Sequence, residues 1–242
     1  HRYGRRQRQM CIRDSPTGVR MVRFGSAGEV VWEAGPWNDH RRTGRIDGHR
    51  CRLRLAGRHD VGNAAAAYAV LREFGISAKD AIEAMESVVP EAMRLTPRQC
   101  GRAVVWNDAY NANPESIRAA MVAFADLVEP AKPKVLVLGE VLELGHWSEH
   151  AHQELGESIA RSHAVDPFHE IFLVGDAFSL AAERLQADGF PVTHAKDAVS
   201  IQERFQSLLT QPVVVLMKGS RGTGLERLLP SAGEEPLLGS MG

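Results

Sequence analysis

Four largely apolar runs in the second half of the chain constrain its fold more than any other feature. The runs span residues 103–107, 135–138, 171–174 and 213–217 and are rich in valine and leucine. They alternate with segments at 117–127, 151–159, 178–185 and 198–208 whose apolar residues recur at helical spacing. Continuously apolar strands separated by amphipathic helices are typical of a parallel sheet covered on both faces. The sequence therefore predicts a Rossmann-like, three-layer α/β domain over residues 93–232.

A different pattern precedes this domain. Short apolar runs at residues 19–24, 30–32 and 51–55 alternate with Gly, Asn and Asp turns, which is typical of β-hairpins. From Asp60 the apolar residues take helical spacing, and Gly75 follows as a stop signal. Ser77 and Asp80 then begin a second helix, which Pro90 ends. Strands followed by two helices indicate the last part of an α/β domain over residues 16–92, with residues 90–102 as the connection to the next domain.

Composition excludes several classes of protein. The three cysteines are widely separated, so they predict neither a disulfide framework nor a zinc site and fit a cytoplasmic location. No apolar run approaches the ~18 residues of a membrane span, and no signal peptide is recognisable, so membrane insertion and secretion are not expected. Residues 1–15 hold five arginines and one aspartate without apolar periodicity. We interpret them as a non-native or disordered segment rather than a nucleic-acid-binding arm, and residues 233–242 as a tail.

Polar and glycine residues follow three of the predicted strands. Ligands of open parallel sheets bind outside the carboxyl ends of the strands, where loops lead into helix N-termini. One edge of the predicted sheet would therefore carry Asp108, Tyr110, Asn111 and Asn113 after the first strand, Gly139, Glu140 and Glu143 after the second, and Lys218, Gly219, Ser220 and Arg221 after the last.

Two stretches at this edge allow more than one interpretation. In WNDAYNANPES (residues 106–116), Asn113 is a good helix cap and Pro114 a good first helical residue. Asp108 either caps a turn or accepts hydrogen bonds from the hydroxyls of a nucleotide sugar. In LMKGSRGTGLE (residues 216–226) the glycine spacing resembles a P-loop, but the Lys and Ser or Thr of that motif are absent. Lys218 and Arg221 either grip a carboxylate or phosphate or form a solvated basic turn.

The histidines of GHWSEHAHQE (residues 145–154) do not predict a metal site. Ser148 is expected to cap a helix and to leave His146 outside it, while His150 and His152 are two residues apart and point to different faces. We interpret them as helix-surface histidines. The chain also lacks a Gly-x-Ser-x-Gly elbow, a His-Glu-x-x-His pair and a Gly-x-Gly-x-x-Gly turn after a first strand, which argues against hydrolases and NAD-dependent dehydrogenases.

Taken together and in this order, these segments resemble the Mur ligase family. The likeness covers about residues 20–230. It rests on GRHDVGNAAAA (57–67), Arg94, NDAYNANPES (107–116), VLGEVLELG (137–145) with Ser148 and His152, and KGSR (218–221) with Glu226. The resemblance implies a remnant of the family's central, ATPase-type α/β domain followed by its complete C-terminal Rossmann-like domain. Within the family, the Tyr-Asn-Ala-Asn corner and Lys-Gly-Ser-Arg point to the member that adds D-alanyl-D-alanine.

The resemblance implies an ATP-dependent, monomeric amide ligase of peptidoglycan precursor synthesis. ATP would phosphorylate the terminal carboxylate of a UDP-N-acetylmuramoyl-tripeptide, and the amine of D-alanyl-D-alanine would attack the acyl phosphate, with Mg²⁺ spreading the charge. Carried over by position, the nucleotide contacts would be His59, Asn63, Arg94 and Asp108. The dipeptide and acyl phosphate would meet Tyr110, Asn111, Lys218, Ser220 and Arg221, of which Lys218 and Arg221 are the candidates for a catalytic role.

The sequence also departs from the family's pattern. Asp60 stands where the family usually has Asn. The UDP-binding domain, the Gly-rich phosphate loop, the magnesium ligands and the modified lysine are expected upstream of this fragment, so the chain alone should hold half an ATP site and show no turnover. Two alternatives stay open. One is a related ligase, such as the diaminopimelate-adding enzyme or folylpolyglutamate synthase, and the other is a non-catalytic nucleotide-binding α/β module.

Overall fold

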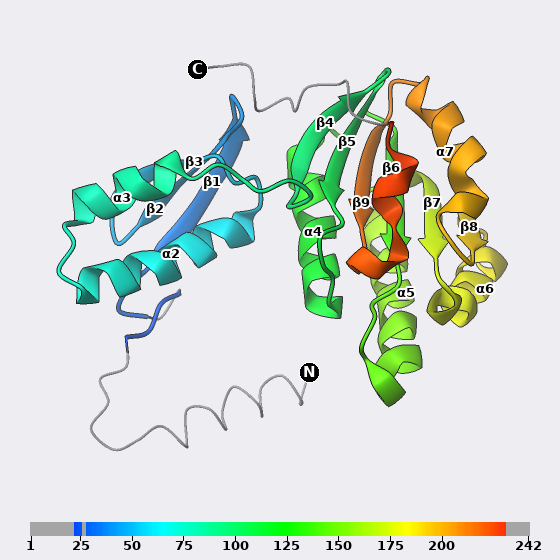
Figure 1. Cartoon of the computed structure of the whole chain (residues 1–242), viewed down its shortest axis with the longest axis horizontal. Helices are drawn as coiled ribbons and strands as arrows, with labels where there is room; N and C mark the ends of the chain where they lie inside the picture. The colour runs from blue at the N-terminus through cyan, green and yellow to red at the C-terminus, as the bar shows by residue number, and fades with distance from the viewer. Residues whose placement is uncertain (1–21, 26–27, 231–242) are drawn as a thin grey trace.

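The structure, a computed structural model, describes residues 22–25 and 28–230 and contains two α/β units, each with its own sheet (Figure 1). The interpretations of residues 1–15 and 233–242 concern segments outside the described residues. None of the helices in the described part of the chain combines the length and apolarity that a membrane crossing requires.

The first unit is an antiparallel sheet with two helices packed on one face. Its strands, in the order β1-β2-β3, are β1 (Trp32–Asn38), β2 (Arg41–Ile46) and β3 (His49–Leu53), and its helices are α2 (Arg58–Glu73) and α3 (Ala78–Ser87). Apolar residues of the strands and helices, including Ile46, Leu53, Val61 and Tyr68, form a common buried core. Both predicted helices are confirmed, and β3 overlaps the predicted run at 51–55. The other strands differ from the prediction: β1 begins two residues after the start of the run at 30–32, β2 falls outside every predicted run, and the described residues of the run at 19–24 form only an isolated bridge between Phe24 and Val30.

The helix ends of this unit follow local signals. Ser77 caps α3 by accepting a hydrogen bond from Asp80 N at 3.1 Å, and Gly75, at φ 78°, takes the left-handed conformation that ends α2. The Asp60 side chain accepts from Gly57 N at 2.9 Å in the first turn of α2. The departure from the family's usual Asn at this position therefore leaves a carboxylate acting as a helix cap.

The second unit is a six-stranded sheet in the order β4-β5-β9-β6-β7-β8. Strands β5 to β9 are parallel, and β4 pairs antiparallel with β5. The strands are β4 (Thr96–Cys100), β5 (Ala103–Asp108), β6 (Lys134–Gly139), β7 (Phe168–Val174), β8 (Val192–Ala195) and β9 (Val214–Lys218). The helices are α4 (Pro114–Leu127), α5 (Ser148–Val165), α6 (Ser179–Ala187) and α7 (Gln202–Leu209).

Helices cover both faces of the six-stranded sheet. One buried core joins the sheet to α4, α5 and α6, and the other joins it to α7 and the short turn Leu225–Leu228. The predicted Rossmann-like, three-layer arrangement is therefore confirmed for this unit. The helix after β5 begins as expected, because Asn113 accepts from Ser116 N at 2.8 Å and Pro114 is the first helical residue.

Two strands of the six-stranded sheet were missed by the prediction, and both lie at its edges. Strand β4 falls within the segment predicted as a connection, and β8 lies between two predicted helices. Their sequences, TPRQC and VTHA, are short, and few of their residues are buried. Edge strands need not be apolar on both faces, and an edge also tolerates Pro97. In the six-stranded sheet the apolar runs therefore mark the central strands only.

Candidate functional site

The carboxyl ends of β5, β9 and β6 meet at one edge of the second sheet, because β9 lies between β5 and β6. We call the last residues of these strands and the turns that follow them the rim, which spans residues 108–113, 139–143 and 218–221. Its centre is an ion pair between neighbouring strand ends, with Lys218 Nζ 2.7 Å from Asp108 Oδ2. Lys218 also donates to the carbonyl oxygens of Asn111 at 3.0 Å and Asp108 at 3.4 Å. Only 3% of Lys218 is exposed, so its ammonium group ties the corner after β5 to the end of β9.

Asp108 is held from a second side by the chain that enters β4. Leu95 N donates to Asp108 Oδ1 at 3.1 Å, so each carboxylate oxygen has a protein donor. Burial raises the pKa of the Asp108 carboxyl above its usual value, while Lys218, His59 and the Leu95 N–H oppose that change.

Tyr110 gathers two arginines from different parts of the chain. The guanidinium of Arg94 lies over the Tyr110 ring at 4.4 Å from its centroid, and that of Arg221 lies at 5.5 Å. Both arginines are exposed, and 38% of Tyr110 is exposed. Two cations fixed beside one aromatic ring and open to solvent make a suitable site for a carboxylate or phosphate.

The backbone that carries Arg94 is pinned on both sides. Met93 and Leu95 have φ values of 64° and 49°, in the left-handed region that residues other than glycine rarely adopt. Two hydrogen bonds hold this conformation: Tyr110 N donates to Met93 O at 3.2 Å, and Leu95 N donates to Asp108. Strained backbone of this kind is concentrated at functional sites, and here it aims Arg94 at Tyr110.

The turns after β6 and β9 are packed against each other through two glycines. A Cβ atom on Gly219 would lie 2.8 Å from Gly139 Cα, so the turn after β6 leaves no room for a side chain at position 219. Ser220 is buried, and its hydroxyl accepts from Leu142 N at 3.0 Å. The Glu140 side chain accepts from Ala177 N at 3.1 Å. Ser220 and Glu140 therefore order the loops of the rim.

His152 is not a helix-surface residue, so that prediction is wrong. Its side chain is fully buried; Nδ1 donates to Ser148 O at 2.7 Å, and Nε2 accepts from Val141 N at 3.0 Å. These partners require a neutral imidazole with its proton on Nδ1, and they fix the loop after β6. Ser148 is the first residue of α5 rather than its cap. His150 does lie on the helix surface, 3.5 Å from Glu154.

The remaining predicted residues are Asn111 at the rim and His59 and Asn63 on α2. Asn111 offers its carbonyl to Lys218, and its side chain accepts from Ala112 N at 2.8 Å. His59 and Asn63 are exposed and four residues apart, so they share one face of α2. Within residues 22–25 and 28–230 no group of three or more His, Cys, Asp or Glu side chains is arranged to hold a metal ion.

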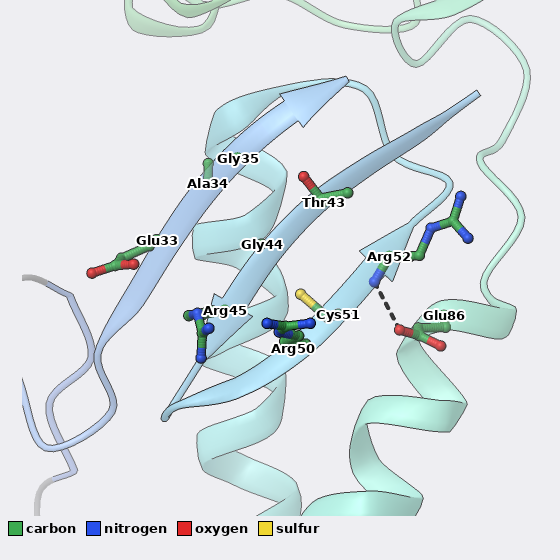
Figure 2. Close-up of a pocket in the computed structure, with 10 residues that line it drawn as sticks. All are labelled: Glu33, Ala34, Gly35, Thr43, Gly44, Arg45, Arg50, Cys51, Arg52 and Glu86. Carbon is green, nitrogen blue, oxygen red and sulfur yellow. Dashed lines mark hydrogen bonds between the residues drawn. The ribbon is translucent and has the colours of Figure 1, made fainter. Parts of the chain in front are cut away.

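A second basic surface was not predicted. A hollow of about 560 Å³ lies on the face of the first sheet that points away from α2, and Figure 2 shows the residues that line it. Arg45 and Arg50 are cross-strand partners there, and Arg52 N donates to Glu86 Oε1 at 2.7 Å. The alternating arginines of HRCRLR were the available signal, because alternate residues of a strand share a face.

Comparison with known proteins agrees with the resemblance found in the sequence. A family profile described as "Mur ligase, glutamate ligase domain" matches residues 93–221. The UDP-N-acetylmuramoyl-tripeptide--D-alanyl-D-alanine ligase of Bacillus subtilis is 32% identical over 189 residues, which cover 76% of this chain and 40% of that protein. The corresponding ligase of Escherichia coli is 31% identical over 191 residues, 77% of this chain and 39% of that protein.

Solved structures give the same picture. MurF from Acinetobacter baumannii superposes with a TM-score of 0.73 at 29% identity, over 86% of this chain and 46% of that one. MurF from Thermotoga maritima, solved with ADP, has a TM-score of 0.73 at 20% identity and shares the fold. The chain spans about 40% of the length of the curated relatives it matches. On the match to residues 93–221, this chain belongs to the Mur ligase family.

Proposed function

We propose that this chain is part of a cytoplasmic, ATP-dependent amide ligase that joins D-alanyl-D-alanine to a UDP-N-acetylmuramoyl-tripeptide through an acyl phosphate, in peptidoglycan precursor synthesis. One observation carries the proposal: Arg94 and Arg221 converge on Tyr110, beside the Asp108–Lys218 pair, in a chain 32% identical over 189 residues to a ligase of that name. The nucleotide would lie between the first unit, over residues 16–92, and the second, over residues 93–232.

The nucleotide side of the proposed site has hydrogen-bond donors and acceptors that can serve a ligand. A carboxylate has about four lone-pair positions, and Lys218 and Leu95 N occupy one oxygen each of Asp108. Asp108 therefore keeps acceptor capacity for ribose hydroxyls. His59 and Asn63 present ring nitrogens and an amide from one face of α2, which suits the edge of an adenine base.

The dipeptide side is assigned to the exposed arginines. Arg221 and Arg94 can each grip a carboxylate or a phosphoryl group with two parallel N–H donors, and both are accessible. Lys218 is buried and already bonded to three oxygen atoms, so we assign it to positioning of the corner that carries Tyr110 and Asn111. The structure therefore favours Arg221 over Lys218 as the direct contact to substrate.

Magnesium is expected in a reaction that transfers a phosphoryl group from ATP. The described residues hold no cluster of ligands for it, and two carboxylates of the rim already have protein partners, Asp108 in Lys218 and Glu140 in Ala177 N. We assign no step of the reaction to a metal on this part of the protein.

A chimeric enzyme tests the proposal. Residues 93–230 of this chain replace the matching segment of the Bacillus subtilis ligase, and phosphate release is measured with UDP-N-acetylmuramoyl-tripeptide, ATP and D-alanyl-D-alanine. We expect turnover that depends on the dipeptide, and a loss of about 100-fold in kcat/KM for the dipeptide with Arg221→Ala. Arg227→Ala, in the following turn, is the matched control. A folded chimera that used a single amino acid instead of D-alanyl-D-alanine would favour a different Mur-type ligase.

The isolated chain provides a second test. Because positioning and phosphate electrostatics supply nearly all the catalysis in phosphoryl transfer, we expect the 242-residue chain to bind ADP weakly and to show no ligase turnover. Phosphate release by the chain alone that required D-alanyl-D-alanine would contradict this expectation.

A further inference from the structure

One aspartate of the second unit is gripped by two arginines of the first. Asp126 lies near the end of α4, and its Oδ2 is 2.6 Å from Arg42 Nη1, while its Oδ1 is 2.8 Å from Arg58 Nη2. Each carboxylate oxygen therefore has its own guanidinium. Asp126 is 84 residues from Arg42 and 68 from Arg58, so these contacts join distant parts of the chain. We call Arg42, Arg58 and Asp126 the Asp126 latch.

Arg42 is fixed in place before it meets Asp126. It is fully buried in β2; its Nε donates to Ala56 O at 2.9 Å, and its Nη1 donates to Gly35 O at 2.9 Å. One guanidinium thus holds strand β1, the segment that leads into α2 and helix α4 together. The Arg42 side chain cannot change rotamer without breaking its hydrogen bonds to these two carbonyl groups and to Asp126.

Apolar packing supports the ion pairs. The rings of Trp37, in β1, and Trp106, in β5, meet edge to face with their centroids 6.0 Å apart. Ala56 belongs to the first unit, yet it is buried in the same core as Trp106 and Phe124 of the second unit. The contact between the units is therefore a packed patch with a charged centre, and such centres fix register better than apolar surfaces alone.

The latch joins the start of α2 to the end of α4, and each helix also carries one half of the proposed nucleotide site. Ala56 and Arg58 flank Gly57, the residue before α2, and His59 follows immediately. On the other side, α4 is the helix that starts from the Asp108–Asn113 corner. A rotation of the first unit about this patch would move His59 and Asn63 relative to Asp108.

We infer that Asp126 is a positioning residue, which acts through Arg42 and Arg58 to hold the start of α2 against the end of α4, and so fixes the first unit relative to the rim such that one nucleotide can reach His59, Asn63 and Asp108 together. The effect on nucleotide affinity rests on the proposed function, whereas the effect on the placement of the two units does not. The latch acts by geometry, since neither arginine needs to touch the ligand.

The placement of the units is measured by electron–electron double resonance between spin labels on Lys79→Cys in α3 and Glu183→Cys in α6. Both positions are exposed, and Cys11 is replaced by serine. Burial raises the pKa of the Cys51 thiol to about 11, so it reacts slowly with the label at neutral pH. We expect one narrow distance distribution for the unmodified latch and a broad one for Asp126→Asn.

Two further variants separate the latch from general stability. Arg58 is half exposed, so Arg58→Gln removes one arm without disturbing the core and should broaden the distribution less than Asp126→Asn does. Glu154→Gln is the matched control, because Glu154 pairs with Arg118 at 3.0 Å wholly within the second unit. The control should leave the distribution narrow. Narrow distributions in both latch variants would overturn the inference.

ADP titration of the same 242-residue variants tests the consequence for the site. We expect affinity to fall about tenfold in Asp126→Asn and to be largely restored in Asp126→Glu, with Glu154→Gln unchanged. A broadened distribution with unchanged ADP affinity would contradict the positioning role. If no form of the chain binds ADP, the proposed function loses its support, and the distance measurement still decides whether the latch fixes the units.

Discussion

Lys218 and Arg221 are three residues apart and carry the same charge, yet their surroundings differ, and so do the roles that we assign to them. Lys218 is buried against Asp108 and two carbonyl oxygens, whereas Arg221 is exposed beside Tyr110. The sequence placed both residues at one rim because both follow predicted strands. It could not separate their roles, because burial depends on which strand lies beside β9, and Asp108 is 110 residues away from Lys218.

Replacing Lys218 should therefore lower the stability of the fold, rather than only weaken substrate binding. Lys218→Met keeps the length of the side chain but leaves the buried Asp108 carboxylate without its cation, and we expect a loss of about 3 kcal/mol in the free energy of unfolding. Urea denaturation followed by circular dichroism measures it. Lys196→Met, at an exposed position, should change stability little. Equal stability of the two variants would show that the pair contributes no net stability.

The buried imidazole of His152 gives a second residue-scale prediction. His152→Leu has a similar volume but no acceptor, so the buried Val141 N–H loses its partner, at a cost of about 1–3 kcal/mol. We expect faster hydrogen exchange at the Val141 amide and in the loop after β6, while His150→Leu, on the exposed side of α5, leaves exchange there unchanged. Protection of Val141 in both variants would argue against this role for His152.

At the scale of elements, the sequence predicted the helices and strands that local patterns encode, and it missed strands that are defined by pairing with a neighbouring strand. The four central strands and the helices between them follow from runs that are apolar on both faces. The Asn113 cap and the Gly75 stop follow from residue types with strong local preferences. Strands β4 and β8 were not predictable, because an edge strand is defined by its neighbour's hydrogen bonds rather than by its own burial.

The meeting of β6 and β9 at their carboxyl ends gives a prediction for these elements. Gly219→Ala would place its Cβ 2.8 Å from Gly139 Cα, a backbone atom, so the two turns must separate, and we expect a loss of about 1–3 kcal/mol in stability. Gly222→Ala is the matched control in the next turn, since its Cβ would meet only the end of the Leu142 side chain at 2.7 Å. Thermal unfolding of both variants measures the difference. A control as destabilised as Gly219→Ala would show that any side chain in this turn is harmful.

At the scale of the whole molecule, the two units were predictable separately and their contact was not. Each core follows from the periodicity of its own segment. The Asp126 latch joins residues 84 and 68 positions apart, and an arginine in a strand and an aspartate near a helix end carry no local signal of a partner. Hydrogen bonds from Arg58 and Arg42 hold the pKa of the Asp126 carboxyl below its usual value of 3.8, with that of Arg58 the largest cause.

The contribution of the latch to stability should therefore depend on pH in one direction. A carboxyl whose pKa is lower in the folded state than in the unfolded state stabilises the fold fully above the unfolded value and loses that contribution as pH falls through the folded value. The stability difference between the unmodified chain and Asp126→Asn should be constant from pH 7 down to about 5 and shrink below about pH 4. Urea denaturation of both proteins at a series of pH values measures it, with Glu154→Gln as the control for an ion pair inside one unit. A stability difference that grew on acidification would mean that the ionised Asp126 carboxylate destabilises the folded chain. The two arginines would then fix the position of Asp126 and lower the stability of the fold.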